Sequence, residues 1–248
     1  MNNFLDKEYR VLSSVCDAQG LMGIHNVFDC FMDLAAEHAG QLGVSYYDML
    51  EHRCYWVAVR TRVIFYDRPK LGETIHAMTW PGKPGLAKSD RFYLLYSGDR
   101  IMAEGRTEWA AQDIDTGAVR RTDSYGYPAE LVHREERVCA SPFTRFRPMQ
   151  PEAGNGQNCR YKVNSTDIDV GRHMNNVAYV RMLMGTFSVS EHEEMDIREV
   201  EISYRRACYE GEDLDICRER TDDGWRFAVI RPDGETAVDA LLRLGARE

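Results

Sequence analysis

The chain has 248 residues, of which 44% are hydrophobic and 29% charged, and its 31 Lys and Arg against 40 Asp and Glu give a net charge of −9. This composition is typical of a globular protein with a sizeable core, and it excludes collagen, coiled coils and disordered tails. The acidic balance argues against a nucleic-acid-binding protein, because such proteins hold phosphates with basic surfaces.

The cysteines and the N-terminal segment indicate the compartment. Seven cysteines are scattered along the chain and none forms a C-x-x-C pair, which favours a reducing compartment over a disulfide framework or a zinc ribbon. The N-terminal residues show no signal peptide, and no window approaches the ~20 apolar residues of a membrane helix. We therefore expect a cytoplasmic protein without a membrane span.

The first half of the chain begins with a helical pattern and continues with strands. Asn26 is a suitable N-cap, and Gly40 and Gly43 end the predicted helix. An alternating run from residue 57 predicts a half-buried strand, and extended runs follow over 73–80, 91–96 and 101–112. The helix face comprises Phe28, Phe31, Met32, Ala35, Ala39 and Leu42, and one side of the strand comprises Val57, Val59, Thr61, Val63 and Phe65.

The same order of elements returns in the second half. A second helix is predicted to begin at Asn176, an extended run covers 202–206, and Gly211-Glu212 resembles the earlier Gly72-Glu73. Hairpin turns follow at 222–224 and 232–234, before a last alternating run from Val238 to Leu244. A repeat of helix, strand, Gly-Glu turn and hairpin in one order indicates a duplication. The apolar residues of the second helix are Val177, Val180, Met184 and Phe187.

The duplication predicts two domains of α+β class. We expect an N-terminal half over 1–133, a Pro-, Gly- and Arg-rich linker over 134–157 and a C-terminal half over 158–248. Each half has one helix followed by antiparallel strands, and a sheet that curls around the helix buries it most economically.

One segment, from Thr166 to Tyr179, gathers polar residues just before the second helix. His173 can act as a base near neutral pH, and Asp169 four residues earlier can orient its imidazole. Backbone N–H groups near Asn175 and Asn176 can bind an oxyanion at the helix start. Taken alone, the same residues also fit turn and capping chemistry with a structural histidine.

The segment resembles the D-x-D-x-N-x-H-x-N-N-x-x-Y signature of acyl-acyl carrier protein (acyl-ACP) thioesterases, which release free fatty acids. Residues 60–74, 115–121 and Tyr204-Arg205-Arg206-Ala207-Cys208 resemble further elements of that family. The resemblance implies a double hotdog fold, two tandem halves that each wrap a curved antiparallel sheet around a long central helix. It further implies acyl-chain binding in the first half, the catalytic motif in the second, and Asp169 and His173 as site residues.

The chain departs from the family pattern at two positions. Gly171 stands where the signature has Asn, and Ala207 stands where the Y-R-R-E-C element has Glu. Cys208 is retained, either as a nucleophile with His173 as its base or as a small buried residue. Glu210 would share a strand face with Cys208 and supply a displaced carboxylate if the strand continued that far. Asn175 and Asn176 are interpreted as capping and loop-fixing groups.

Three functions follow from these residues. The preferred one is hydrolysis of fatty acyl-ACP; acyl-CoA hydrolysis and non-hydrolytic acyl or acyl-carrier binding by a degenerate site are the alternatives. No cofactor and no metal are expected, and the oligomeric state, including a homodimer, stays open. The acidic carrier protein, with its phosphopantetheine arm, requires a local basic surface. Candidates for that surface are Lys83, Lys88, Arg91, Arg120, Arg121, Arg145, Arg147, Arg160 and Arg172.

Overall fold

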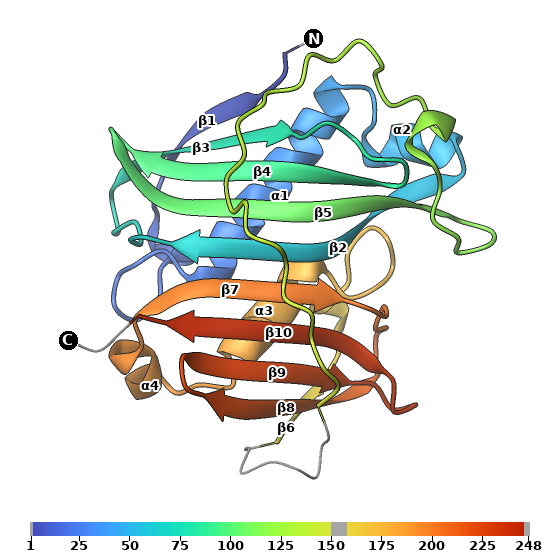
Figure 1. Cartoon of the computed structure of the whole chain (residues 1–248). Coiled ribbons are helices and arrows are strands. Elements are labelled where there is room, and N and C mark those ends of the chain that lie inside the picture. The colour runs from blue at the N-terminus through green and yellow to red at the C-terminus, as the bar shows by residue number, and fades with distance from the viewer. Residues whose placement is uncertain (1, 150–157, 246–248) are drawn as a thin grey trace. The chain divides into compact units, whose positions relative to one another are not determined.

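The computed structural model describes residues 2–149 and 158–245. The chain forms two compact units, residues 1–141 and 142–248. Each unit contains an antiparallel sheet with a helix against it (Figure 1). The predicted α+β class is therefore confirmed in both units. No helix among the described residues has the length and apolar character needed to cross a membrane.

The N-terminal unit has a five-stranded sheet in the order β1-β3-β4-β5-β2, with every neighbouring pair antiparallel. Helix α1 packs against β3, and a short helix α2 contacts β2. The elements are β1 (Leu5–Arg10), α1 (Ile24–Gln41), α2 (Tyr46–Glu51), β2 (Cys54–Phe65), β3 (Thr74–Pro81), β4 (Lys88–Ser97) and β5 (Arg100–Asp113), with 3-10 turns η1 (Ser13–Val15) and η2 (Thr122–Ser124).

The C-terminal unit repeats this plan with the strand order β7-β10-β9-β8-β6. Its central helix α3 has 9 residues against 18 in α1, so it is not the long helix that was predicted. The elements are β6 (Cys159–Lys162), η3 (Ser165–Asp167), α3 (Asn176–Met184), α4 (Val189–Glu194), β7 (Ile197–Tyr204), β8 (Asp213–Thr221), β9 (Gly224–Ile230) and β10 (Thr236–Leu244).

Helix α1 is confirmed, but its predicted N-cap is wrong. The helix begins at Ile24 with Gly23 as N-cap, and Asn26 lies inside the first turn. Close approach of α1 to the sheet requires a glycine at position 105, because a Cβ there would lie 2.6 Å from the Phe31 ring. Phe31 stacks on Tyr93 of β4 with ring centroids 4.8 Å apart. This packing fixes the helix over the strands that follow it in the chain.

The alternation predicted for β2 holds only after a β-bulge. The register with β5 shifts between Ala58 and Arg60, so the strand changes phase there. Before the bulge Ala58 is buried and Val57 is half-buried, and Val59 at the bulge itself is half-buried, which contradicts the single face predicted for this strand. After the bulge the predicted face is confirmed, since Thr61, Val63 and Phe65 are all buried.

In the C-terminal unit the helix and both hairpin turns lie as predicted, but two boundaries differ. Helix α3 ends at Met184, so Phe187 lies beyond it. Strand β7 ends at Tyr204, so Cys208 and Glu210 lie in the β7–β8 connection. The expectation that Glu210 shares a strand face with Cys208 is therefore wrong, and the Glu210 side chain is exposed.

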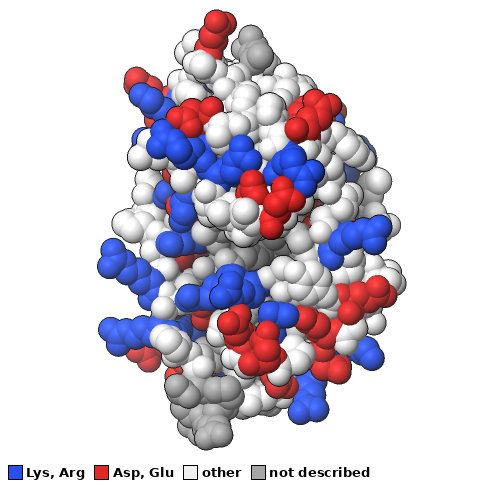
Figure 2. Space-filling view, turned by 90° about the vertical axis from the view of Figure 1, so that its right-hand side faces the viewer, with Lys and Arg blue, Asp and Glu red and all other residues white. Residues whose placement is uncertain are grey.

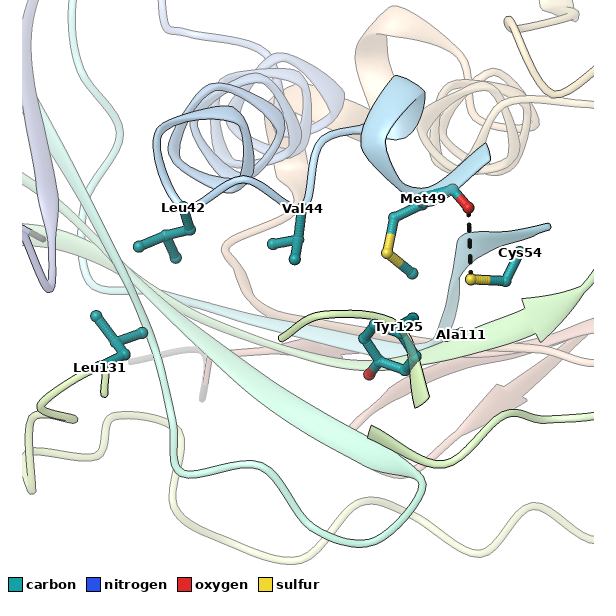
Figure 3. Close-up of a cluster of buried hydrophobic side chains, with 7 residues drawn as sticks. All are labelled: Leu42, Val44, Met49, Cys54, Ala111, Tyr125 and Leu131. Carbon is teal, nitrogen blue, oxygen red and sulfur yellow. Dashed lines mark hydrogen bonds between the residues drawn. The ribbon is translucent and has the colours of Figure 1, made fainter. Parts of the chain in front are cut away.

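A cluster of buried apolar side chains lies beside the C-terminal end of α1 in the N-terminal unit (Figure 3). It brings together the segment after α1, the helix α2, strands β2 and β5, and residues 125–131. The Trp56 ring meets Tyr125 edge-on with centroids 5.3 Å apart, and its indole N–H donates to the Val44 carbonyl at 2.9 Å. The cluster consists of Leu42, Val44, Met49, Cys54, Ala111, Tyr125 and Leu131.

The segment predicted as a linker makes specific contacts with each unit. In the N-terminal unit, the Trp80 indole N–H donates to the Glu136 carbonyl at 3.0 Å and the Arg134 guanidinium stacks over the Trp80 ring. In the C-terminal unit, the Thr144 N–H donates to the buried Glu201 carboxylate at 2.6 Å. Residues 150–157 of the predicted linker lie outside the described residues.

Candidate active site

The polar segment before α3 is held by a buried aspartate. Asp167 ends the 3-10 turn η3, and its carboxylate accepts from the Asn164 N–H and from the Tyr161 hydroxyl, both at 2.8 Å. Only 5% of Asp167 is exposed, and its carbonyl accepts from the Asn175 N–H at 2.8 Å. Asp167 therefore fixes the loop between η3 and α3 through these hydrogen bonds, in agreement with the capping interpretation.

A tight turn brings Asp169 and His173 together. The Asp169 N–H donates to the His173 carbonyl at 3.1 Å, and the Arg172 N–H donates to the Asp169 carbonyl at 3.0 Å. The turn requires a left-handed backbone at Arg172, whose φ is 60°. As a result, Nδ1 of His173 lies 3.7 Å from Oδ1 of Asp169, and both side chains are about one-quarter exposed, at 24% and 26%.

Gly171 lies directly against both of these side chains. Its N–H donates to Oδ1 of Asp169 at 2.8 Å. A Cβ at this position would lie 2.9 Å from Nε2 of His173 and 3.0 Å from Oδ1 of Asp169. The absence of a side chain at 171 therefore gives the imidazole its place beside Asp169.

The start of α3 leaves one backbone donor available. The Asn175 side chain caps the helix by accepting from the Val177 N–H at 2.7 Å, as predicted. The Ala178 N–H donates back to the Asn175 carbonyl at 3.0 Å. Among the described residues, neither the N–H nor the side-chain amide of Asn176 has a hydrogen-bond partner. The backbone N–H and the side-chain amide of Asn176 are therefore available as hydrogen-bond donors at a helix N-terminus, three residues after His173 in the chain.

Cys208 lies under the loop and is fully buried. Its carbonyl accepts from the Met174 N–H at 2.8 Å, and its N–H donates to the Tyr179 hydroxyl at 3.2 Å. Burial raises the pKa of the Cys208 thiol to about 11, with a further contribution from the nearby Glu212 carboxylate. At pH 7 roughly one part in ten thousand of such a thiol is ionised. The neighbouring Ala207 carries no group that can accept a proton.

The N-terminal unit contains a counterpart of this loop. The Asp17 N–H donates to the Leu21 carbonyl at 2.8 Å, and the Met22 N–H donates to the Pro69 carbonyl at 2.7 Å. Asp17 thus corresponds to Asp169, Leu21 to His173 and Pro69 to Cys208. The left-handed position is Gly20 there, with φ 72°. The sequence repeat is therefore matched by a repeated hydrogen-bond pattern. Only the C-terminal copy has a histidine, His173, where the N-terminal copy has Leu21.

The matching Gly-Glu turns are structural in both units. A Glu73 carboxylate oxygen accepts from the Lys70 N–H at 2.9 Å, and a Glu212 oxygen accepts from the Tyr209 N–H at 3.2 Å. Glu212 also forms an ion pair with Arg231 at 2.8 Å.

In the part of the chain that the structure describes, no group of three or more His, Cys, Asp and Glu side chains is arranged to hold a metal ion.

The N-terminal unit contains a cavity of about 160 Å³ between α1 and its sheet, and the cavity is partly open to solvent, since Ala36 in its lining is exposed. One wall is the α1 face of Met32, Ala35, Ala36 and Ala39, and part of another is Val44 and Trp56, which belong to or pack on the cluster in Figure 3. Most of the lining is apolar. Arg91, predicted to lie on a basic surface, instead lines this cavity and is buried, so that prediction is wrong.

Comparisons with known proteins agree with this architecture. Residues 2–122 match the model of the acyl-ACP thioesterase N-terminal domain, and residues 151–239 match that of the acyl-ACP thioesterase C-terminal domain. An acyl-ACP thioesterase structure from Bacteroides thetaiotaomicron is 16% identical, covers 98% of both chains and has a TM-score of 0.88. The 12:0-ACP thioesterase structure from Umbellularia californica is 17% identical, covers 100% of this chain and 99% of its own, and has a TM-score of 0.89.

Curated relatives from plants are also distant in sequence. A palmitoyl-acyl carrier protein thioesterase of Arabidopsis thaliana is 22% identical over 98% of this chain and 60% of its own length. An oleoyl-acyl carrier protein thioesterase 1 of the same plant is 20% identical over 81% of this chain and 59% of its own. The chain spans about three fifths of the length of these relatives. The structural likenesses confirm the predicted double hotdog fold, and the two domain matches, found in tandem, show that the chain belongs to the acyl-ACP thioesterase family.

Proposed function

We propose that this chain hydrolyses the thioester of fatty acyl-ACP to release a free fatty acid. The observation that carries the proposal is the turn that sets Nδ1 of His173 3.7 Å from Asp169, in a chain that belongs to the acyl-ACP thioesterase family. That separation exceeds a hydrogen bond, and catalytic hydrogen bonds are often long before substrate binds.

His173 acts as the general base in this proposal. With Nδ1 directed at Asp169, Nε2 takes a proton from water as the water oxygen attacks the thioester carbonyl carbon. Asp169 orients the imidazole and stabilises its protonated form. The carbonyl electron pair moves onto oxygen, and the free N–H and amide of Asn176 stabilise that oxyanion. When the carbonyl re-forms, the C–S bond breaks, and the departing thiolate takes the proton from the imidazolium.

Gly171, Ala207 and Cys208 have supporting roles in this mechanism. Gly171 keeps space open beside Nε2, where a Cβ would lie 2.9 Å from that nitrogen. Cys208 fixes the loop through its backbone, and its buried, protonated thiol does not attack the substrate. Ala207 leaves the proton transfer to His173 alone, because it carries no second base.

The test is release of free thiol from acyl-ACP by purified protein. His173→Ala should reduce turnover by about 10²-fold or more, the usual contribution of a general base. Asp169→Asn should reduce it less. His192→Ala is the matched control, since His192 contacts the Met184 carbonyl in the same unit, away from this loop. Unchanged turnover in His173→Ala would contradict the proposed mechanism, and a panel of acyl-ACP and acyl-CoA substrates separates the two thioester classes.

A second candidate function is acyl binding without hydrolysis. Gly171 and Ala207 favour it, because the family pattern described above has Asn and Glu there. The double variant Gly171→Asn with Ala207→Glu tests whether those groups restore activity. The His173 ring must move to admit the new side chain, since even a Cβ at 171 would lie 2.9 Å from it. Robust hydrolysis by the wild-type protein excludes this candidate; tight binding of acyl-ACP without thiol release supports it.

We further propose that acyl carrier protein docks on the C-terminal unit through Arg145, Arg147 and Arg172. All three are exposed, and none forms an ion pair with a described residue. The one other candidate in this unit, Arg160, is paired with Asp215 at 3.3 Å. Figure 2 shows Lys and Arg interspersed with Asp and Glu on the face it presents, so unpaired cations matter more here than their total number.

The docking proposal is tested by the Michaelis constant for acyl-ACP. The variant Arg145→Glu, Arg147→Glu, Arg172→Gly should raise it by about tenfold or more, and the increase should shrink at high salt. Glycine is chosen at 172 because it accepts the left-handed backbone, as Gly20 does in the N-terminal unit. Arg198→Glu is the control, an exposed cation already paired with Asp196. An unchanged constant in the triple variant places docking elsewhere.

A further inference from the structure

The cavity of the N-terminal unit contains a buried cation in a mostly apolar lining. Arg91 extends from the inner face of β4 and is only 8% exposed. Its Nη1 donates to Nδ1 of His38 at 3.1 Å and to Oγ1 of Thr79 at 3.4 Å. Both acceptors are neutral groups. A guanidinium has five N–H donors, so most of its hydrogen-bonding capacity is left for whatever occupies the cavity.

No carboxylate among the described residues balances this charge. Asp90 is the acidic residue of the cavity lining, and it is engaged by Arg106, whose Nε and Nη2 donate to its two oxygens at 3.1 and 2.9 Å. His38 accepts from Arg91 because it is neutral: burial and the adjacent guanidinium lower its pKa to about 4. A buried cation without a counterion is costly and calls for a compensating group.

Two further polar groups of the lining are buried and weakly satisfied. Nε1 of Trp109 and the hydroxyl of Tyr127 make no hydrogen bond of good geometry among the described residues, and their polar neighbours are Tyr93 for Trp109 and Ser89 for Tyr127. An indole N–H can only donate, and so can a guanidinium. Arg91 and Trp109 come from neighbouring strands β4 and β5, while Tyr127 comes from the segment after η2. The cavity therefore offers donors and a positive charge to its occupant and lacks an available anionic acceptor.

The cavity volume limits the occupant to a small group or chain segment. At about 160 Å³ it is close to the size of a cavity of about 150 Å³ that holds one benzene molecule, so it accepts roughly six carbon-sized atoms. The apolar wall of α1 suits methylene groups, whereas a plain hydrocarbon end would leave the charge of Arg91 without a counterion. A hydrocarbon alone complements only part of this lining.

We propose that this cavity receives an acyl chain that bears an acceptor oxygen on its distal part, and that a carboxylate suits it best. The inference rests on the proposed thioesterase function, and it names the class of acyl group on which the enzyme acts. A distal carboxylate accepts from Arg91 and Trp109 and neutralises the buried charge, while a hydroxyl or keto oxygen satisfies the donors alone. Water in the cavity is the competing occupant, and the experiment separates the two.

The experiment compares acyl carrier proteins loaded with acyl groups of equal length that end in a methyl, a hydroxyl or a carboxylate. For the wild-type protein we expect kcat/KM to favour the carboxylate over the methyl end by about tenfold or more, as for other charge-assisted hydrogen bonds. Arg91→Met should remove or reverse this preference. Arg100→Met is the matched control, because Arg100 is 52% exposed and pairs with Asp67 and Glu73 outside the cavity.

A binding measurement keeps the result independent of catalysis and of folding. The monomethyl ester of a dicarboxylic acid is titrated calorimetrically against the methyl ester of the matching monocarboxylic acid, with thermal unfolding as a check on each variant. Tighter binding of the acid-ended ester, lost in Arg91→Met, supports the inference even if no thioester is hydrolysed. Active enzyme with equal kcat/KM for all three ends, unchanged in Arg91→Met, overturns it and leaves the proposed function standing. If the protein prefers the hydroxyl end and this preference depends on Arg91, the claim that the chain bears a distal acceptor oxygen is supported. The claim that a carboxylate suits the cavity best is then overturned.

Discussion

Arg68 of the N-terminal unit and Ala207 of the C-terminal unit occupy equivalent positions in the internal repeat. Each directly precedes the residue whose carbonyl accepts from the loop methionine, Pro69 for Met22 and Cys208 for Met174. The Arg68 guanidinium pairs with the loop carboxylate Asp17. Ala207 provides no cation, so the equivalent carboxylate Asp169 is left to His173. The two copies of one loop thus differ in what their aspartate binds.

This difference predicts that Ala207→Arg inactivates the C-terminal site. A guanidinium at 207 should bind Asp169, as Arg68 binds Asp17, and compete with the imidazole for the carboxylate. We expect turnover of acyl-ACP to fall by about tenfold or more while the melting temperature is kept. Ala207→Met supplies bulk without charge and is the control. Equal losses in both variants would assign the effect to size and refute a competition for Asp169.

Gly171→Ala should disturb the same pair by contact alone. The new Cβ would lie 2.9 Å from Nε2 of His173, and the imidazole is the flexible partner, so the ring should move away from Asp169. A displacement of about 1 Å of a catalytic group can cost about 10² in rate. We expect a loss of kcat with little change in the Michaelis constant. Val170→Ala, an adjacent change at a 70% exposed side chain, should leave both constants unaltered; wild-type kcat in Gly171→Ala would contradict the role proposed for glycine.

The sequence predicted the elements with clear apolar periods and missed those without them. Strand β1 in the N-terminal unit and β6 in the C-terminal unit are each the terminal strand in their unit's order, and they carry charged residues such as Lys7, Glu8 and Lys162, which protect sheet edges but hide the alternation. Helices α2 and α4 were also missed, although both begin with a recognisable capping box, at Ser45 with Asp48 and at Ser188 with Glu191.

The sequence predicted the parts of the candidate site whose residues are close both in the chain and in space. Asp169 and His173 lie four residues apart on one turn, so their proximity follows from local structure. The bulge in β2 and the burial of Arg91 depend instead on partners 12 or more residues away, such as β5, Thr79 and His38. No local pattern distinguishes a buried arginine from a surface one.

Cys208→Ala provides the test between a nucleophile and a structural residue. Because burial raises the pKa of this thiol to about 11, we expect the variant to keep turnover within a few-fold of the wild-type protein. Removal of a true nucleophile would instead cost about 10³-fold or more. Cys217→Ala, which removes another buried thiol from the same unit, controls for loss of packing. In the native protein, alkylation of Cys208 should be slow and should accelerate on unfolding.

The buried pair of His38 and Arg91 predicts a pH-dependent term in stability. Burial first, and then the Arg91 charge, lower the pKa of His38 from 6.5 to about 4. Between these values the unfolded chain binds a proton at His38 and the folded protein does not. The free energy of unfolding should therefore fall as the pH falls through this window, and the contribution is complete only above the unfolded pKa.

The expected size of this term makes it measurable by difference. Between about pH 7 and about pH 5, the wild-type protein should lose about 2 kcal/mol of unfolding free energy from this one group. His38→Gln carries no titratable ring, so its stability should change less over the same interval, whatever its absolute value. Urea denaturation at both pH values measures how much the unfolding free energy of each protein changes with pH. His52→Gln, at an exposed histidine, is the control. If the unfolding free energy changed with pH equally in the wild-type protein and in His38→Gln, the pKa of His38 would not be lowered by folding. Arg91 would then not be a buried, uncompensated cation beside His38.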